Sequence, residues 1–193
     1  MTNLLRLHSD ALTLADRQVS TLRPDDLELP TPCAGWSLGE LLAHMIGQHH
    51  GFAQAVREHT APADAYRPVP FEPSVWQDSV RALRDAFATA DPHASAVAVE
   101  LTPTPLPIEQ LVAAQLLDTV VHTWDIAASV GAEFRPPDEL LAATAAIAEA
   151  IPDRAFGPGH AFAVRLTVEG DAWQRTLALV GREISASVPT GRG

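Results

Sequence analysis

The 193-residue chain is 47% hydrophobic and 19% charged, a composition typical of a globular domain with a substantial core. Its formal net charge is −11 and all thirteen basic residues are arginines, so we expect no nucleic acid as a partner. No apolar run approaches the roughly 20 residues of a membrane-spanning helix and no signal-peptide pattern is present, so we expect no membrane partner and a cytoplasmic location.

The first half of the chain predicts three helices. The first covers residues 3–22, where apolar residues recur on one face and Pro24 follows the end. The second begins with the capping-box sequence of residues 37–40 and runs to about His59. A proline-rich loop then leads to a third helix over residues 74–90.

The second half predicts an extended lead-in, a long helix and two shorter ones. Residues 94–107 are expected to be extended, with a short strand as one interpretation, and the long helix runs from Pro107 to Gly131. Shorter helices are expected over residues 137–150 and from a cap at Asp171 to about Val180, with an extended stretch before the last one. Together these elements predict one all-α domain over residues 1–193, a bundle with an additional C-terminal helix and irregular segments.

The long helix carries a polar stripe through otherwise apolar surroundings. At about 100° per residue, five polar side chains fall within roughly an 80° sector: Gln115, Asp118, His122, Asp125 and Ser129. One interpretation is that this stripe is only the hydrated side of the helix. The other is a metal site, because Asp118 and His122 lie four residues apart on one face and could bind the same ion.

A third ligand has to come from another helix. His44 lies beside the core face of the second helix, and facing helices of a bundle can place it next to Asp118 and His122. Two imidazoles and one carboxylate leave coordination positions open for water or a substrate atom, which is typical of a catalytic metal site.

Two separated segments carry a resemblance to a known family. PTPCAGWSLGELLAHMIG, followed by LLDTVVHTWDIAASVG, resembles the actinobacterial branch of the DinB-like metal-binding four-helix bundles, which is called mycothiol-dependent maleylpyruvate isomerase-like. The resemblance covers nearly the whole chain and favours the metal interpretation of the stripe. It implies that His44 and His122 bind the metal. The remaining ligand position, commonly Glu or His in the family, is the shorter Asp118 here, which would bind the ion directly or through water.

The positions of neighbouring residues on these helices indicate further roles. Asp125 would orient a histidine or a bound water, with a helix-surface charge as the alternative, and Gln48 would line the cavity. Cys33 lies in a recurrent loop of the family, and because no adjacent histidine is evident we interpret it as a packing residue rather than a nucleophile. His8, near the start of the chain, is interpreted as a surface or packing histidine.

The family implies a divalent ion, zinc first with nickel or another metal as alternatives, that activates mycothiol as a co-substrate. The leading hypothesis is therefore a thiol transferase or isomerase-like enzyme acting on a small electrophile, with a homodimer as a plausible assembly. Isomerases of this type carry an additional C-terminal domain, which the residues after the bundle are too few to replace, so the specific isomerisation is not expected. The alternatives are a metal-dependent hydrolase, lyase or cyclase without a thiol, and a non-catalytic metal- or ligand-binding protein.

Overall fold

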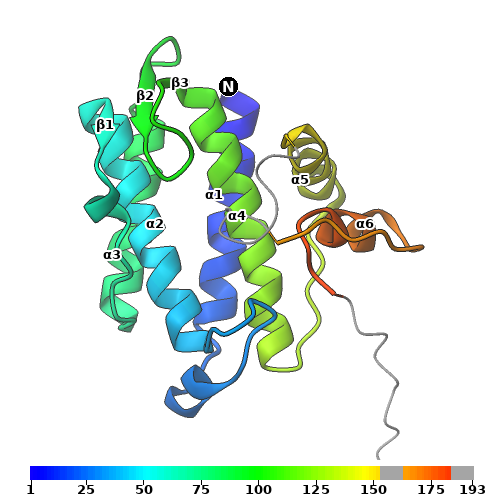
Figure 1. The fold of residues 1–193 in the computed structure, drawn as a ribbon. Coiled ribbons are helices and arrows are strands. Elements are labelled where there is room, and N and C mark those ends of the chain that lie inside the picture. Colours follow the sequence, from blue (N-terminus) through cyan, green and yellow to red (C-terminus); the bar gives the residue numbers. More distant parts are fainter. Residues whose placement is uncertain (153–162, 184–193) are drawn as a thin grey trace, which may run out of the picture. The chain divides into compact units, whose positions relative to one another are not determined.

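The computed structural model of the chain describes residues 1–152 and 163–183 (Figure 1). It divides into two compact units, Met1–Leu140 and Leu141–Gly193, which are described separately below. The prediction of a single domain over the whole chain stays a prediction. No helix within the described ranges is both long enough and apolar enough to cross a membrane.

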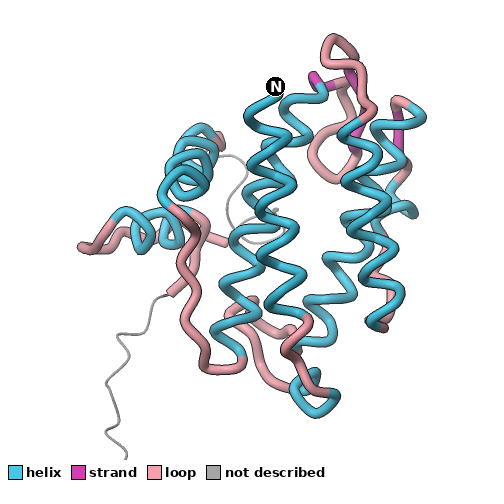
Figure 2. The backbone as a smooth tube through the Cα atoms, turned by 180° about the vertical axis from the view of Figure 1, so that it is seen from behind, coloured by secondary structure: helices cyan, strands magenta, loops and turns pink. Residues whose placement is uncertain are grey.

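Four helices that run side by side form most of the first unit (Figures 1 and 2). They are α1 (Thr2–Val19), α2 (Leu38–Glu58), α3 (Pro73–Ala88) and α4 (Ile108–Ser129). The closest pairs are α1 with α4 and α2 with α3. Each helix contributes fully buried apolar side chains to one core, including Leu12, Phe52, Leu83 and Leu111. Each such side chain stabilises the fold by roughly 1.5–3 kcal/mol. The all-α prediction is confirmed.

The ends of the helices follow local chemistry. Ser37 Oγ accepts a hydrogen bond from the Glu40 N–H at 3.3 Å, and the Glu40 carboxylate accepts one from the Ser37 N–H at 2.8 Å, which confirms the predicted capping box. Gly131, two residues after the end of α4, has a φ of 68°, a left-handed conformation that suits glycine. The first helix ends at Val19 instead of residue 22.

A small sheet lies at the end of the unit where α2 ends and α4 begins (Figure 2). Its order is β1 (Thr60–Ala61), β2 (Ser95–Ala98), β3 (Leu106–Pro107), with β1–β2 parallel and β2–β3 antiparallel. β2 confirms the short strand expected before the long helix. The sequence did not predict its two partners, because strands of two residues are too short to show an alternating pattern.

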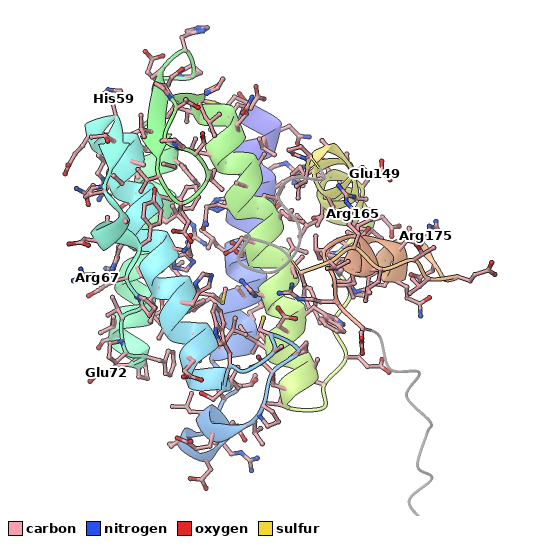
Figure 3. The ribbon with its side chains drawn as sticks, viewed as in Figure 1. His59, Arg67, Glu72, Glu149, Arg165 and Arg175 are labelled. Atoms are coloured by element: carbon pink, nitrogen blue, oxygen red, sulfur yellow. The ribbon has the colours of Figure 1, made fainter. Side chains whose placement is uncertain are left out.

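The chain between α2 and α3 returns along the outside of α2. Figure 3 shows this path through its labels on His59, Arg67 and Glu72. Two short 3₁₀ helices occur in the unit, η1 (Pro24–Glu28) and η2 (Ala63–Tyr66), and the second packs against α2. A Cβ added at Gly47 would lie 2.5 Å from the Arg67 carbonyl oxygen, and one at Gly51 would lie 2.2 Å from the Tyr66 ring. Only glycine at these two positions permits so close an approach.

The second unit contains most of α5 (Asp138–Ala150), which begins at the boundary, and α6 (Ala172–Leu179). The predicted cap of the last helix is confirmed, because the Asp171 side chain accepts from the Gln174 N–H and the Gln174 side chain accepts from the Asp171 N–H, both at 2.9 Å. Residues 163–168 are irregular rather than a strand. Phe162, the first residue of the expected extended stretch, lies outside the described residues.

Candidate metal centre

The structure brings together the three residues that the sequence predicts as metal ligands. His122 Nε2 lies 3.2 Å from Asp118 Oδ1, both on α4, and the imidazole of His44 on α2 meets that of His122 edge to face with 5.5 Å between ring centroids. One donor atom from each of the three residues lies within 4.8 Å of the other two.

The position of the three donors follows from the direction of the two helices. Cys33, just before α2, reaches Asp125 near the end of α4, whereas Gln48, further along α2, reaches Glu100 in the loop that precedes α4. The helices therefore run in opposite directions, and the first half of α2, where His44 lies, faces the middle of α4. The i, i+4 spacing on α4 directs Asp118 and His122 to that side.

The residues present fit a divalent ion. Ligand atoms on a tetrahedral ion with bonds of about 2.0–2.2 Å are about 3.3–3.6 Å apart, close to the distance of 3.2 Å between His122 Nε2 and Asp118 Oδ1. Two imidazoles and a carboxylate are donors that zinc and other late transition metals accept. His122 is 7% exposed and the Asp118 side chain 28% exposed, so the donors are sheltered without being sealed from solvent.

The electrostatics of the three donors differ. Burial lowers the pKa of His44 to about 4, so this imidazole is neutral at pH 7 and keeps a lone pair for a metal. Burial also acts to lower the pKa of His122, but the Asp118 charge and hydrogen bonds to its neighbours raise it well above its ordinary value. The reverse holds for Asp118: burial acts to raise the pKa of its carboxyl, and His122 lowers it overall.

Asp125 contacts the imidazole of His122 on the side opposite Asp118. Its Oδ2 lies 2.8 Å from His122 Nδ1, the ring nitrogen that points away from Asp118, and its side chain is fully buried. The alternative that Asp125 is a helix-surface charge is therefore wrong. A carboxylate in this position fixes the orientation of the imidazole and directs Nε2 toward the donor set.

Cys33 is the residue whose place the sequence interpretation missed. Its Sγ lies 3.3 Å from Asp125 Oδ2 and 3.9 Å from His122 Nδ1, so the statement that no histidine is adjacent is wrong. Because Cys33 and His122 are 89 positions apart in the sequence, no local sequence pattern reveals this contact. The one available signal was that Cys33 and His122 both lie in the two segments that carry the family resemblance. At this distance the Cys33 S–H can donate a hydrogen bond to the Asp125 carboxylate.

Two further side chains border the site along α2. The Trp36 ring lies against His44, with 4.8 Å between centroids, and is 37% exposed. One turn after His44, Gln48 is 4% exposed and its Nε2 donates to Glu100 Oε1 at 3.4 Å. The cavity-lining role of Gln48 stays a prediction. A separate cleft of about 530 Å³ contains none of these donors; its lining is Thr21, Leu22, Arg23, Asp26, Leu29, Ser129 and Val130.

Comparison with known proteins finds one matching family and two relatives of similar length. Residues 8–127, well over half of the chain, match the family described as the mycothiol maleylpyruvate isomerase N-terminal domain. The uncharacterized proteins MT0763 and Rv0738 of Mycobacterium tuberculosis are each 28% identical over 166 residues, which cover 82% of this chain and 85% of theirs.

Two crystal structures resemble the fold. One is the mycothiol-dependent maleylpyruvate isomerase, with a TM-score of 0.57 and 16% identity, and the other is its histidine-to-alanine variant, with a TM-score of 0.59 and 15% identity. Each match covers 76% of this chain and 68% of the other chain, and at such identities it shows the fold alone. The matched family region covers more than half of the chain, and it includes α2 and the part of α4 that carries the donors. This chain therefore belongs to the mycothiol maleylpyruvate isomerase N-terminal domain family.

Proposed function

We propose that this chain is a metal-dependent enzyme in which the thiol mycothiol attacks a small electrophile, as a transferase or an isomerase-like enzyme. The observation that carries the proposal is the convergence of His44, Asp118 and His122 between α2 and α4. Membership of the family supports mycothiol as the thiol. The crystal structures with the same fold are named as mycothiol-dependent enzymes, which agrees with this choice.

His44, Asp118 and His122 would hold a divalent ion, zinc in the first place and nickel in the second. Such an ion favours a thiolate over a thiol and so raises the supply of nucleophile near neutral pH. The surrounding residues set the protonation and the orientation of these ligands. Burial keeps His44 neutral. Asp125 accepts a hydrogen bond from the Nδ1–H of His122, which leaves Nε2 for the ion.

The partner of this chemistry is a small molecule, since the donors lie sheltered between two helices. The homodimer and the cytoplasmic location stay predictions from the sequence.

Metal content tests the site first. Elemental analysis of the purified protein should find about one divalent ion per chain, and His44→Ala, Asp118→Ala and His122→Ala should each lose most of it. His93→Ala is the matched control, because His93 is an exposed histidine in the loop before β2 and should leave the content unchanged. A folded wild-type protein that binds no ion after reconstitution would refute the proposal. Metal retained in Asp118→Ala alone would mean that Asp118 acts through water.

The thiol step is tested separately. In the cobalt-substituted protein, added mycothiol should produce a sulfur-to-metal charge-transfer absorption, and a panel of small electrophiles should then show metal-dependent conjugation or isomerisation. Metal binding without any thiol signal would favour the hydrolase, lyase or cyclase alternative. Thiol binding without turnover of any electrophile would favour a non-catalytic binding protein.

A further inference from the structure

One turn from the metal donors, toward the sheet, the facing sides of α2 and α4 carry amide side chains. Gln48 follows His44 by one turn on α2, and Gln115 precedes Asp118 by about one turn on α4. Because the two helices run in opposite directions, these residues lie at the same level. Gln48 is 4% and Gln115 is 1% exposed, so both amides are buried beside the site.

Gln115 is left with an unused acceptor. Its Oε1 is buried and has no hydrogen-bond partner. Buried acceptors are almost always paired, and leaving one unpaired costs the desolvation of that group. The position of this acceptor one turn from an open metal site indicates that a bound molecule supplies the missing donor.

Glu100 adds a second acceptor at this level. It lies in the loop between β2 and β3, which Figure 1 shows over the upper parts of α2 and α4, and its Oε1 accepts from Gln48 Nε2. The hydroxyl of Tyr66 is buried without a partner. Burial raises the pKa of Tyr66, and the Glu100 carboxylate raises it further.

We propose that Gln115, Gln48 and Glu100 form a recognition subsite for an uncharged ligand group that donates hydrogen bonds, such as an amide N–H or a hydroxyl. A carboxylate there would bring no donor to Gln115 Oε1 and would be repelled by Glu100. The inference rests on the proposed function, since it assigns the part of the substrate or thiol that extends one turn beyond the reacting atom. It predicts selection against ligands that carry a carboxylate at that distance.

Two thiols of similar length provide the test. N-acetylcysteamine carries an amide N–H and 3-mercaptopropionate a carboxylate, and their binding to the zinc-loaded protein can be followed through the side-chain amide resonances of Gln48 and Gln115. We expect the dissociation constant of N-acetylcysteamine to be at least about tenfold lower. Equal or tighter binding of 3-mercaptopropionate would overturn the proposal.

Variants test whether the subsite causes the preference for the amide over the carboxylate. Gln115→Met keeps the volume of the side chain but removes the acceptor. It should therefore weaken the binding of N-acetylcysteamine about tenfold and leave the binding of 3-mercaptopropionate unchanged. Because the variant also removes an unpaired buried acceptor, its free energy of unfolding should be no lower than that of the wild type. Glu100→Gln should strengthen 3-mercaptopropionate binding severalfold. Glu72→Gln removes one charge at the distant start of α3 (Figure 3) and should change neither value.

Thiol-free analogues separate the subsite from the proposed chemistry. N-ethylacetamide and propionate repeat the comparison without a sulfur atom, in protein with and without metal. If no thiol contacts the metal but N-ethylacetamide still shifts the Gln115 resonance more than propionate does, the proposed function fails and the subsite stands. If neither pair of probes shows a preference, or if the Gln115 and Glu100 variants leave it unchanged, the subsite is refuted.

Discussion

Cys33 Sγ lies 3.3 Å from Asp125 Oδ2, the same carboxylate oxygen that lies 2.8 Å from His122 Nδ1. An S–H and a ring N–H can both donate to one carboxylate oxygen, so the three residues form a chain of hydrogen bonds. It begins in the loop before α2 and ends at a histidine of the donor set. The side chain of Thr31 also stabilises this loop, because its Oγ1 lies within hydrogen-bonding distance of the carbonyl oxygens of Cys33 and Trp36 and can share its hydrogen between them.

Removing the thiol should therefore weaken metal binding without removing a ligand. We expect Cys33→Ala to lower the affinity for zinc about tenfold, because partners that orient a ligand typically contribute 10–100-fold. Cys33→Ser keeps a donor and should retain most of the affinity. Competition with a chromogenic chelator measures both. A sulfur-to-metal absorption in the cobalt protein without added thiol, lost in Cys33→Ser, would instead identify Cys33 as a direct ligand.

Asp125 should matter more than Cys33, since it contacts His122 itself. Asp125→Asn should lower the affinity for zinc by about tenfold to a hundredfold. If Cys33 acts through this carboxylate, the double variant Cys33→Ala/Asp125→Asn should lose little more than Asp125→Asn alone. Losses that simply multiply in the chelator competition would show that the two residues act independently. Circular dichroism of each variant confirms that the helices are retained.

The close approach of η2 to α2 predicts an unusual response to alanine. Gly→Ala in a helix normally gains about 1 kcal/mol. At Gly47 the new Cβ would meet backbone oxygens of Tyr66 and Arg67, so overpacking of about 1–3 kcal/mol should exceed that gain and Gly47→Ala should be less stable in urea unfolding. Gly39→Ala is the milder control, since its closest atom, the Leu27 carbonyl oxygen, is 3.3 Å away. A Gly47→Ala protein as stable as the wild type would contradict this packing.

At Gly51 the obstacle is a side chain, which allows a second check. The Cβ of Gly51→Ala would lie within 2.2 Å of the Tyr66 ring. The double variant Gly51→Ala/Tyr66→Ala should therefore show a coupling free energy, because removal of the ring relieves the clash. Additive changes in the free energy of unfolding would argue against direct contact.

His8 makes stability depend on pH. It is buried against Phe87, which confirms the packing interpretation, and burial followed by the nearby His49 and Arg84 lowers its pKa to about 3. In the unfolded chain its pKa is about 6.5, so between pH 6.5 and 3 the unfolded state binds more protons. Stability therefore falls as the pH falls through this window, by about 2 kcal/mol from His8 at pH 5.

His8→Leu removes this contribution. Relative to the wild type, the variant should gain unfolding free energy as the pH is lowered from 7.5 to 5, by about 2 kcal/mol, because the carboxylates titrate alike in both proteins. Urea unfolding at the two pH values measures the difference. His93→Leu, at an exposed position, is the matched control. A constant difference between His8→Leu and the wild type would mean that His8 has the same pKa in the folded and unfolded chains.

The parts of the fold that sequence predicts are those with local causes. Ser37, Glu40, Asp171 and Gly131 mark helix ends through contacts or backbone angles within a few residues, and each prediction is confirmed. The helical spacing of Asp118 and His122 likewise sets their common face. The end of α1 was placed too late, because the apolar Leu22 continues the pattern after the helix has stopped.

The parts that sequence does not predict depend on tertiary approach. Cys33 meets His122 only because α2 and α4 run in opposite directions, and Glu100 meets Gln48 only because the loop after β2 folds back. No periodicity encodes either contact. The metal roles of His44, Asp118 and His122 stay predictions that the structure supports by bringing the residues together.

The donor set is divided unequally between two helices, and this has a mechanical consequence. Asp118, His122 and their support Asp125 lie within two turns of α4, so their mutual distances are as rigid as the helix. Only the distance to His44 changes when α2 moves relative to α4. If the three residues hold an ion as proposed, a ligand that spreads the two helices would loosen the bond from His44 and keep the bonds from Asp118 and His122, so the number of protein ligands would change through a small movement along a single direction.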